Sequence, residues 1–188
     1  GFFNTGTDEH GVKIFERAKQ SAQDVAVFVD RMAAKFKQLK ELLNLRKKAK
    51  TVKGITTRHS DILSRMAQLM YAGSGIGLAA PQVGINETMI VADIGSGLYK
   101  LINPRIVKRE GQQALEEGCL SIPGWRGEVK RSVTVTVKAL NREGREIRIK
   151  ASEDLLAQAL EHEIDHLDGV LYIDHLTAPD KLWKIPPP

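Results

Sequence analysis

Apolar residues recur at three- and four-residue intervals in three stretches of the chain, and this spacing predicts helices. The first helix is expected over residues 21–43 and the second over residues 60–71. The third follows Ser152, which we expect to cap it, with Glu153 and Asp154 in the first turn, where acidic groups suit the helix dipole.

Between the second and third helices the pattern changes to short runs that suit β-strands. The strand candidates are residues 89–94, 101–102, 106–107, 129–140 and 145–150. Residues 141–144 have turn composition, so the last two candidates should form a hairpin. Because strands and helices do not alternate as βαβ units, the order predicts an α+β fold: mostly antiparallel sheets around a C-terminal helix, with an extra N-terminal helical segment.

Length and composition place the chain among ordinary soluble proteins. Its 188 residues suit one domain, or one domain with an appendage, and its single cysteine cannot form an internal disulfide. No apolar run approaches the roughly 20 residues that span a bilayer, and no secretory signal is recognisable. We therefore expect a location in the cytosol or in the matrix of an organelle, with no membrane partner.

The net charge of +5 is unevenly distributed. Residues 1–60 hold 13 Lys and Arg against 6 Asp and Glu, whereas residues 61–188 hold 15 against 17. The basic excess in the N-terminal third could meet RNA or another anionic surface. We favour the interpretation that these basic residues form the solvated face of a helix, and we expect no DNA partner.

Residues 162–166 read His-Glu-Ile-Asp-His on the predicted C-terminal helix. At this spacing His162 and His166 lie one turn apart on the same face, so two imidazoles can hold one divalent metal ion. Glu163 between them would serve as a general base. The other residues on this helix face are apolar, so both histidines should point toward the core.

A third metal ligand has to come from elsewhere in the chain. In the longer HExxHxxGxxH pattern of one protease class the third histidine would fall on Tyr172, and no glutamate follows Glu163. Cys119 is the better candidate, because its Glu-Gly-Cys-Leu-Ser context indicates a shaped loop that presents a thiolate. An inert buried thiol is the alternative.

A glycine-rich segment, Gly-Ile-Gly-Leu-Ala-Ala-Pro-Gln, occupies residues 75–82. Gly75, Gly77 and Ala80 match a GxGxxA nucleotide fingerprint, but a helix rather than a strand precedes them, which argues against that function. Glycines also permit close approach of the backbone to a bound peptide. Gln82 can donate its amide N–H to a developing oxyanion.

These three motifs, GIGLAAPQ, EGCLS and HEIDH, in this order resemble those of the peptide deformylase family, over about residues 45–185. That family removes the N-formyl group from new bacterial and organellar polypeptides. The resemblance implies metal binding by Cys119, His162 and His166, with Glu163 as general acid and base. It implies Fe(II) as the metal, with Zn, Ni or Co as substitutes.

The resemblance also implies roles in binding and in oxyanion stabilisation. Gln82 and the backbone N–H of Leu120 would donate to the oxyanion. Substrate contacts are expected from Gly75, Ile76, Gly77 and Leu120, with Ile76 and Leu120 contributing to a hydrophobic pocket for methionine. The expected partners are N-formylmethionyl peptides or nascent chains, with the ribosome as a further candidate, and we expect a monomer.

Residues 1–45 differ from the family pattern, because its usual first strand is absent. They resemble a fragment of the methionyl-tRNA synthetase catalytic core without its HIGH and KMSKS motifs. We therefore expect two domains: a helical extension over residues 1–45 with no complete active site, and a deformylase domain over 46–188. An HExxH metallopeptidase and a degenerate, non-catalytic fusion remain alternatives.

Overall fold

The computed structural model describes residues 45–185 of the chain. The helix expected over residues 21–43, and with it the N-terminal helical segment, lies outside the described residues. The bounds are α3 Thr57–Ala72, β1 Gly77–Ala79, η1 Ala80–Val83, β2 Met89–Ala92, β3 Tyr99–Glu110, β4 Gln113–Cys119, β5 Ile122–Arg131, β6 Thr134–Leu140, β7 Glu146–Ser152, α4 Leu155–Leu167, η2 Tyr172–His175 and β8 Leu182–Lys184.

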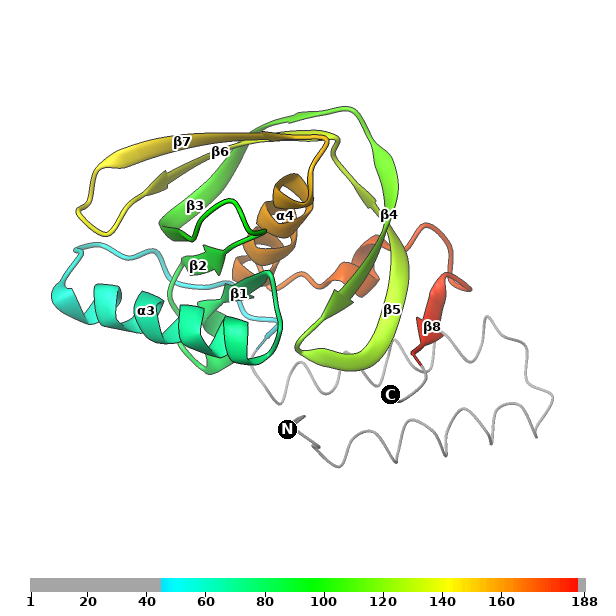
Figure 1. Cartoon of the computed structure of the whole chain (residues 1–188), viewed down its shortest axis with the longest axis horizontal. Helices are drawn as coiled ribbons and strands as arrows, with labels where there is room; N and C mark the ends of the chain where they lie inside the picture. The colour runs from blue at the N-terminus through cyan, green and yellow to red at the C-terminus, as the bar shows by residue number, and fades with distance from the viewer. Residues whose placement is uncertain (1–44, 186–188) are drawn as a thin grey trace.

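Two antiparallel sheets and the helices α3 and α4 are the main elements of the described fold (Figure 1). The larger sheet has the order β1-β2-β3-β6-β7 and the smaller one β4-β5-β8, and every pair of neighbouring named strands is antiparallel. The predicted α+β class with antiparallel sheets and a C-terminal helix is therefore confirmed. The strands β4 and β8 and the first half of β5 were not anticipated from the sequence.

The prediction of one strand over residues 129–140 is wrong. The chain leaves β5 after Arg131, passes through Ser132 and Val133, and enters β6 at Thr134 in the other sheet. Alternation continues across this junction, so a period of two cannot reveal that the chain changes sheets there. Conversely, the two short candidates at 101–102 and 106–107 belong to the single strand β3, which is interrupted by register shifts rather than a turn.

The C-terminal helix begins two residues later than the sequence suggested. Asp154, not Ser152, is its N-cap: the Asp154 carboxylate accepts a hydrogen bond of 2.9 Å from the backbone N–H of Ala157. Asp154 has an extended backbone, as a cap residue should. Leu155, the first residue of α4, is 47% exposed. The buried face of the helix therefore does not include it, although the pattern of apolar residues had predicted that it would.

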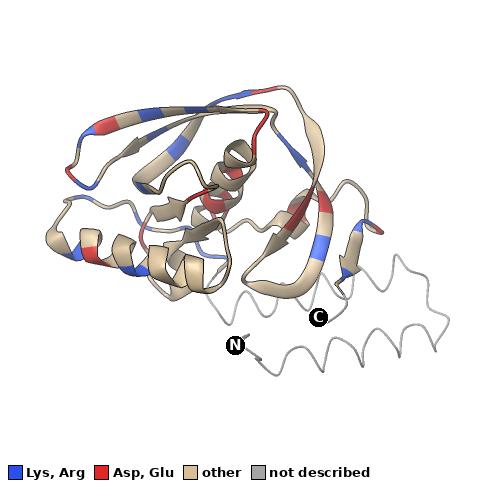
Figure 2. Cartoon of the chain, viewed as in Figure 1, with Lys and Arg blue, Asp and Glu red and all other residues tan. Residues whose placement is uncertain are grey.

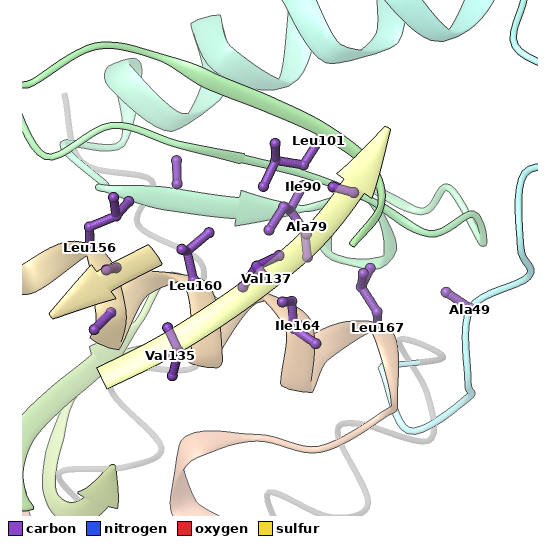
Figure 3. Packing of buried hydrophobic residues seen from close by; sticks show 14 residues of the cluster. Ala49, Ala79, Ile90, Leu101, Val135, Val137, Leu156, Leu160, Ile164 and Leu167 are labelled. Carbon is purple, nitrogen blue, oxygen red and sulfur yellow. The ribbon is translucent and has the colours of Figure 1, made fainter. Parts of the chain in front are cut away.

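Helices pack on both faces of the five-stranded sheet. On one face, α4 contributes Leu156, Leu160, Ile164 and Leu167 to a cluster that includes Val135 and Val137 of β6 (Figure 3). On the other face, α3 packs Leu63, Met66 and Met70 against the alternate residues of β1, β2 and β3. The sheet is thus the central layer between the two helices.

We predict that Leu160→Ala lowers the free energy of unfolding by about 2–5 kcal/mol, because this fully buried side chain leaves a cavity between α4 and the sheet. Leu155→Ala on the same helix removes the same atoms from an exposed position and should change stability by less than about 0.5 kcal/mol. Urea unfolding followed by circular dichroism measures both. Equal losses in the two variants would contradict the packing described for α4.

Candidate metal centre and catalytic site

One turn of α4 and the end of β4 bring three potential metal ligands together. His162 and His166 lie edge to face with ring centroids 5.0 Å apart. The Cys119 Sγ atom lies 3.3 Å from Nε2 of His166, and one donor atom from each of the three residues lies within 4.8 Å of the others. Two imidazoles and one thiolate at this separation suit a tetrahedral metal ion with an open fourth position.

Cys119 occupies the end of a hairpin strand, not the loop that the sequence suggested. It is the last residue of β4, and Leu120 and Ser121 form the turn into β5. Burial raises the pKa of the thiol, but the nearby imidazoles of His166 and His162 outweigh burial and hold that pKa well below its usual range. The site therefore favours the thiolate, which is the form that binds metal.

A buried carboxylate fixes the orientation of His162. Oε2 of Glu117 lies 2.9 Å from Nδ1 of His162, which leaves Nε2 of the ring for the metal. Arg131 donates two hydrogen bonds to Glu117, of 2.7 and 2.9 Å, and a third to Asp165. Burial raises the pKa of Glu117, yet the hydrogen bonds from His162 and Arg131 lower it to about 2, so Glu117 stays ionised.

These orienting residues were missed in the sequence, although a signal was present. Buried Trp125 and Val129 alternate along β5, and Arg131 falls on the same inward parity. Likewise Glu117 shares its parity on β4 with Cys119. A charged residue at a position where alternation predicts burial calls for a buried partner, and that argument identifies both side chains.

Glu163 lies against the glycine-rich segment at the site. It is 4% exposed, and its Oε2 atom has no hydrogen-bond partner among residues 45–185. Burial raises the pKa of Glu163 to about 7, even though both neighbouring histidines act in the opposite direction. A carboxylate with a pKa near neutrality and a free oxygen is suited to accept a proton and to release it.

The glycine-rich segment is not a loop throughout: residues 77–79 form β1 and residues 80–83 form η1. A Cβ added to Gly77 would overlap the carboxyl group of Glu163, so the glycine makes room for that side chain. A Cβ on Gly75 would approach Cδ1 of Leu120 to 2.9 Å. Both glycines therefore serve packing within the chain. Ile76 lies between them and is exposed, as is Leu120.

Gln82 is held with its amide nitrogen toward the cysteine. Its Oε1 atom accepts a 2.7 Å hydrogen bond from the backbone N–H of Ala79, which leaves Nε2 on the opposite side. Nε2 donates to Oγ of Ser121 at 3.1 Å and lies 3.7 Å from Sγ of Cys119. The amide N–H groups are thus directed at the candidate metal centre.

The aromatic ring of Tyr172 packs against the imidazole ring of His162. The two rings are stacked with centroids 6.2 Å apart, and Tyr172 is almost fully buried. The sequence pattern gave Tyr172 only a negative role, as the residue that occupies the position of a third histidine. In the fold its ring stacks on the imidazole of His162, and this contact complements the hydrogen bond that Nδ1 of His162 donates to Glu117.

Comparison with known proteins agrees with this geometry. The sequence model described as Polypeptide deformylase matches residues 18–182. The peptide deformylase of Acetivibrio thermocellus is 57% identical over 130 residues, which cover 69% of this chain and 76% of that protein. That of Thermoanaerobacter pseudethanolicus is 58% identical, covering 69% and 81%.

Solved structures give the same result. The peptide deformylase of Synechococcus elongatus in complex with actinonin has a TM-score of 0.69 and 44% identity, covering 71% of this chain and 74% of that one. The enzyme of Thermotoga maritima has a TM-score of 0.69 and 39% identity, covering 71% and 91%. The chain belongs to the polypeptide deformylase family, whose members remove N-formyl groups from nascent polypeptides.

Proposed function

We propose that this chain hydrolyses the N-formyl group of N-formylmethionyl polypeptides at the centre formed by Cys119, His162, His166 and Glu163. The observation that carries the proposal is the donor set within 4.8 Å beside a buried carboxylate that has a free oxygen. The sequence alone left a metallopeptidase and a non-catalytic fusion as alternatives. The family match over residues 18–182 favours the deformylase.

Cys119, His162 and His166 would hold the metal, and we propose Fe(II), with Zn, Ni or Co as substitutes. The donor set fits such an ion, because the lowered pKa of Cys119 supplies a thiolate and Glu117 leaves Nε2 of His162 available. When bound, a divalent ion acidifies a water molecule and polarises a carbonyl group.

The chain's own residues would move the proton and stabilise the developing charge. Glu163 accepts a proton from the attacking water and later delivers it to the leaving amine. Nε2 of Gln82 and the backbone N–H of Leu120 donate hydrogen bonds to the oxyanion that forms on the formyl oxygen. The formyl C–N bond then breaks, and formate and a free α-amino group are released.

Exposed apolar residues beside the centre support a site for the methionine side chain. Ile76 is 38% exposed and Leu120 is 45% exposed, and Leu120 lies over Gly75. We propose that these two side chains line the pocket and that the adjoining backbone at Gly75 and Gly77 contacts the peptide. Leu120 would then contribute both a side chain and a backbone donor.

Nascent chains at the ribosome are the proposed substrates, and we propose that the protein acts as a monomer in the bacterial cytoplasm or an organellar matrix. Among the described residues, no helix has the length and apolar character needed to cross a membrane. Residues 1–45 are proposed to be a synthetase-like extension without activity of its own. The family match begins at residue 18 and overlaps the second part of that extension.

We predict that Cys119→Ala reduces bound metal from about one ion per chain to a small fraction, because two imidazoles alone bind weakly. Elemental analysis after desalting measures the metal content. Ser121→Ala on the same hairpin turn is the control and should retain the ion. Full retention in Cys119→Ala would remove the thiol from the ligand set.

Glu163→Ala should keep its metal but lose at least ~10²-fold in turnover, the usual scale of general acid–base catalysis. Formate release from formyl-Met-Ala-Ser is the assay. Glu163→Gln preserves the volume beside Gly77 without a basic oxygen and should be equally impaired. Metal loss in both variants would make Glu163 structural, and cleavage of an internal peptide bond by the unmodified protein would favour a peptidase.

Gln82→Leu should lower kcat by on the order of 10²-fold at unchanged metal content, because a donor to the oxyanion is removed. Gln82→Glu retains an oxygen for the Ala79 N–H but presents an acceptor to the centre, so it should be impaired as well. Steady-state kinetics under anaerobic conditions measure both. An unchanged kcat would limit Gln82 to shaping the segment.

A further inference from the structure

Two rows of basic residues cross the strands β3, β6 and β7. In the first row the register sets Arg105 opposite Lys138, and Lys138 opposite Arg148. In the second row Lys108 and Lys150 flank the same residue of β6. Neighbouring strands lie about 4.8 Å apart and alternate residues about 7 Å apart, so the five cations form a compact array.

This array, here called the basic face, lies on the side of the sheet away from α4. Val135 and Val137 of β6 pack in the cluster under α4, so the alternate residues, among them Lys138, lie on the opposite face. Figure 2 shows Lys and Arg recurring along β3, β6 and β7. Arg105, Lys108 and Arg148 are exposed, as is the fifth cation.

A β-bulge in β3 creates the alignment. The register shifts between Ile106 and Lys108, and the intervening Val107 is 40% exposed. Without that shift, Arg105 and Lys108 are three positions apart and would lie on opposite faces of the strand. The extra residue brings both side chains to the basic face.

Carboxylates neutralise only part of this charge. Glu146 pairs with Lys138 at 2.9 Å, and Glu110 pairs with Lys108 at 2.9 Å. Arg105 and Arg148 also lie close enough to Glu146, and Lys150 to Glu110, to help lower the pKa of those carboxyl groups, but within residues 45–185 none of these three cations forms a direct ion pair, so five cations face two carboxylates. Since residues 61–188 hold more acidic than basic residues, the basic face reflects segregation rather than a general excess. Like charges opposed across strands are destabilising, so an anionic partner would stabilise these rows.

We propose that the basic face binds the phosphate backbone of double-helical RNA, an inference that rests on the proposed function, because nascent chains are made on an RNA-containing particle. None of the five residues has an aromatic neighbour within its cross-strand row, so the face offers no platform for stacking single-stranded bases. Double-helical RNA is recognised mainly through shape and backbone contacts, which a flat array of cations supplies. The face lies across the sheet from α4, so bound RNA leaves the metal centre accessible.

The test compares two triple variants of the full-length protein that lose the same charge. The face variant is Arg105→Ala, Arg148→Ala and Lys150→Ala. The control variant is Lys47→Ala, Lys50→Ala and Lys130→Ala, and all three side chains are exposed. Lys130 lies on β5, whereas Lys47 and Lys50 flank Ala49, whose backbone N–H donates to the carbonyl of Leu167 at the end of α4. Fluorescence anisotropy with a labelled 16-base-pair RNA hairpin is recorded from 50 to 200 mM KCl.

The face variant should bind RNA at least ~10-fold more weakly at 100 mM KCl, and the slope of log K against log [KCl] should decrease in magnitude by about 2–3, as expected for three lost phosphate contacts. The control variant should change by less than about twofold. Equal losses in both variants, or no loss in the face variant, would overturn the proposal. Equally strong binding of a DNA duplex of the same sequence, of poly(U), or of phosphatidylserine vesicles would overturn the assignment to duplex RNA.

A second measurement separates this inference from the proposed function. Formate release from free formyl-Met-Ala-Ser should be the same in the face variant and the unmodified protein, because the basic face is remote from the metal centre. If the unmodified, metal-loaded protein releases no formate, the proposed function fails, while the RNA titration still reports on the face. Coincident thermal unfolding curves of the two variants exclude misfolding as the cause of weaker binding.

Discussion

The buried ion-pair network of Arg131 determines how the smaller sheet, α4 and the candidate metal centre fit together. Its guanidinium lies at the end of β5 and joins Glu117 of β4 to Asp165 of α4, so it ties the smaller sheet to the helix. Removing one partner from a buried pair of this kind costs on the order of 3–5 kcal/mol, because a charge is left without compensation. The same network orients His162, and therefore the packing of the smaller sheet against α4 and the geometry of the candidate metal centre have a common cause.

A second constraint is the close approach of β1 to α4. The absence of a side chain at Gly77 lets the strand pass directly against Glu163, which buries the carboxylate and raises its pKa to about 7. Burial of a carboxylate without a full set of hydrogen bonds is costly. Glu163 carries this energetic cost beside the candidate metal ligands, where a proton acceptor with a pKa near neutrality suits hydrolysis.

The five-stranded sheet separates two chemical environments. On one side α4 carries the two histidines and Glu163 toward the smaller sheet. On the other side α3 covers the strands β1 and β2 and leaves the basic face of β3, β6 and β7 uncovered. Such a separation allows one surface to hold a macromolecule while the other remains open to a peptide. The bulge at Val107 and the alternation of β6 produce this arrangement without any additional domain.

Features that depend on local spacing could be predicted from the amino-acid sequence. The i, i+4 histidines of HEIDH, the hairpin at residues 141–144 and the α+β class follow from periods of 3.6 and 2 and from turn chemistry, whereas Cys119 was predicted as the third ligand from its motif and because the other candidates failed. Three other features became visible only in the fold. They are the sheet that each strand joins, the capping of α4 by Asp154 instead of Ser152, and the contact of Gly77 with Glu163, where the sequence had suggested only a contact with a bound peptide. Strand pairing and the contact between Gly77 and Glu163 join residues far apart in the chain, and Ser152 does not cap α4 because it pairs with Thr134 as the last residue of β7. A local pattern carries no information about such distant partners.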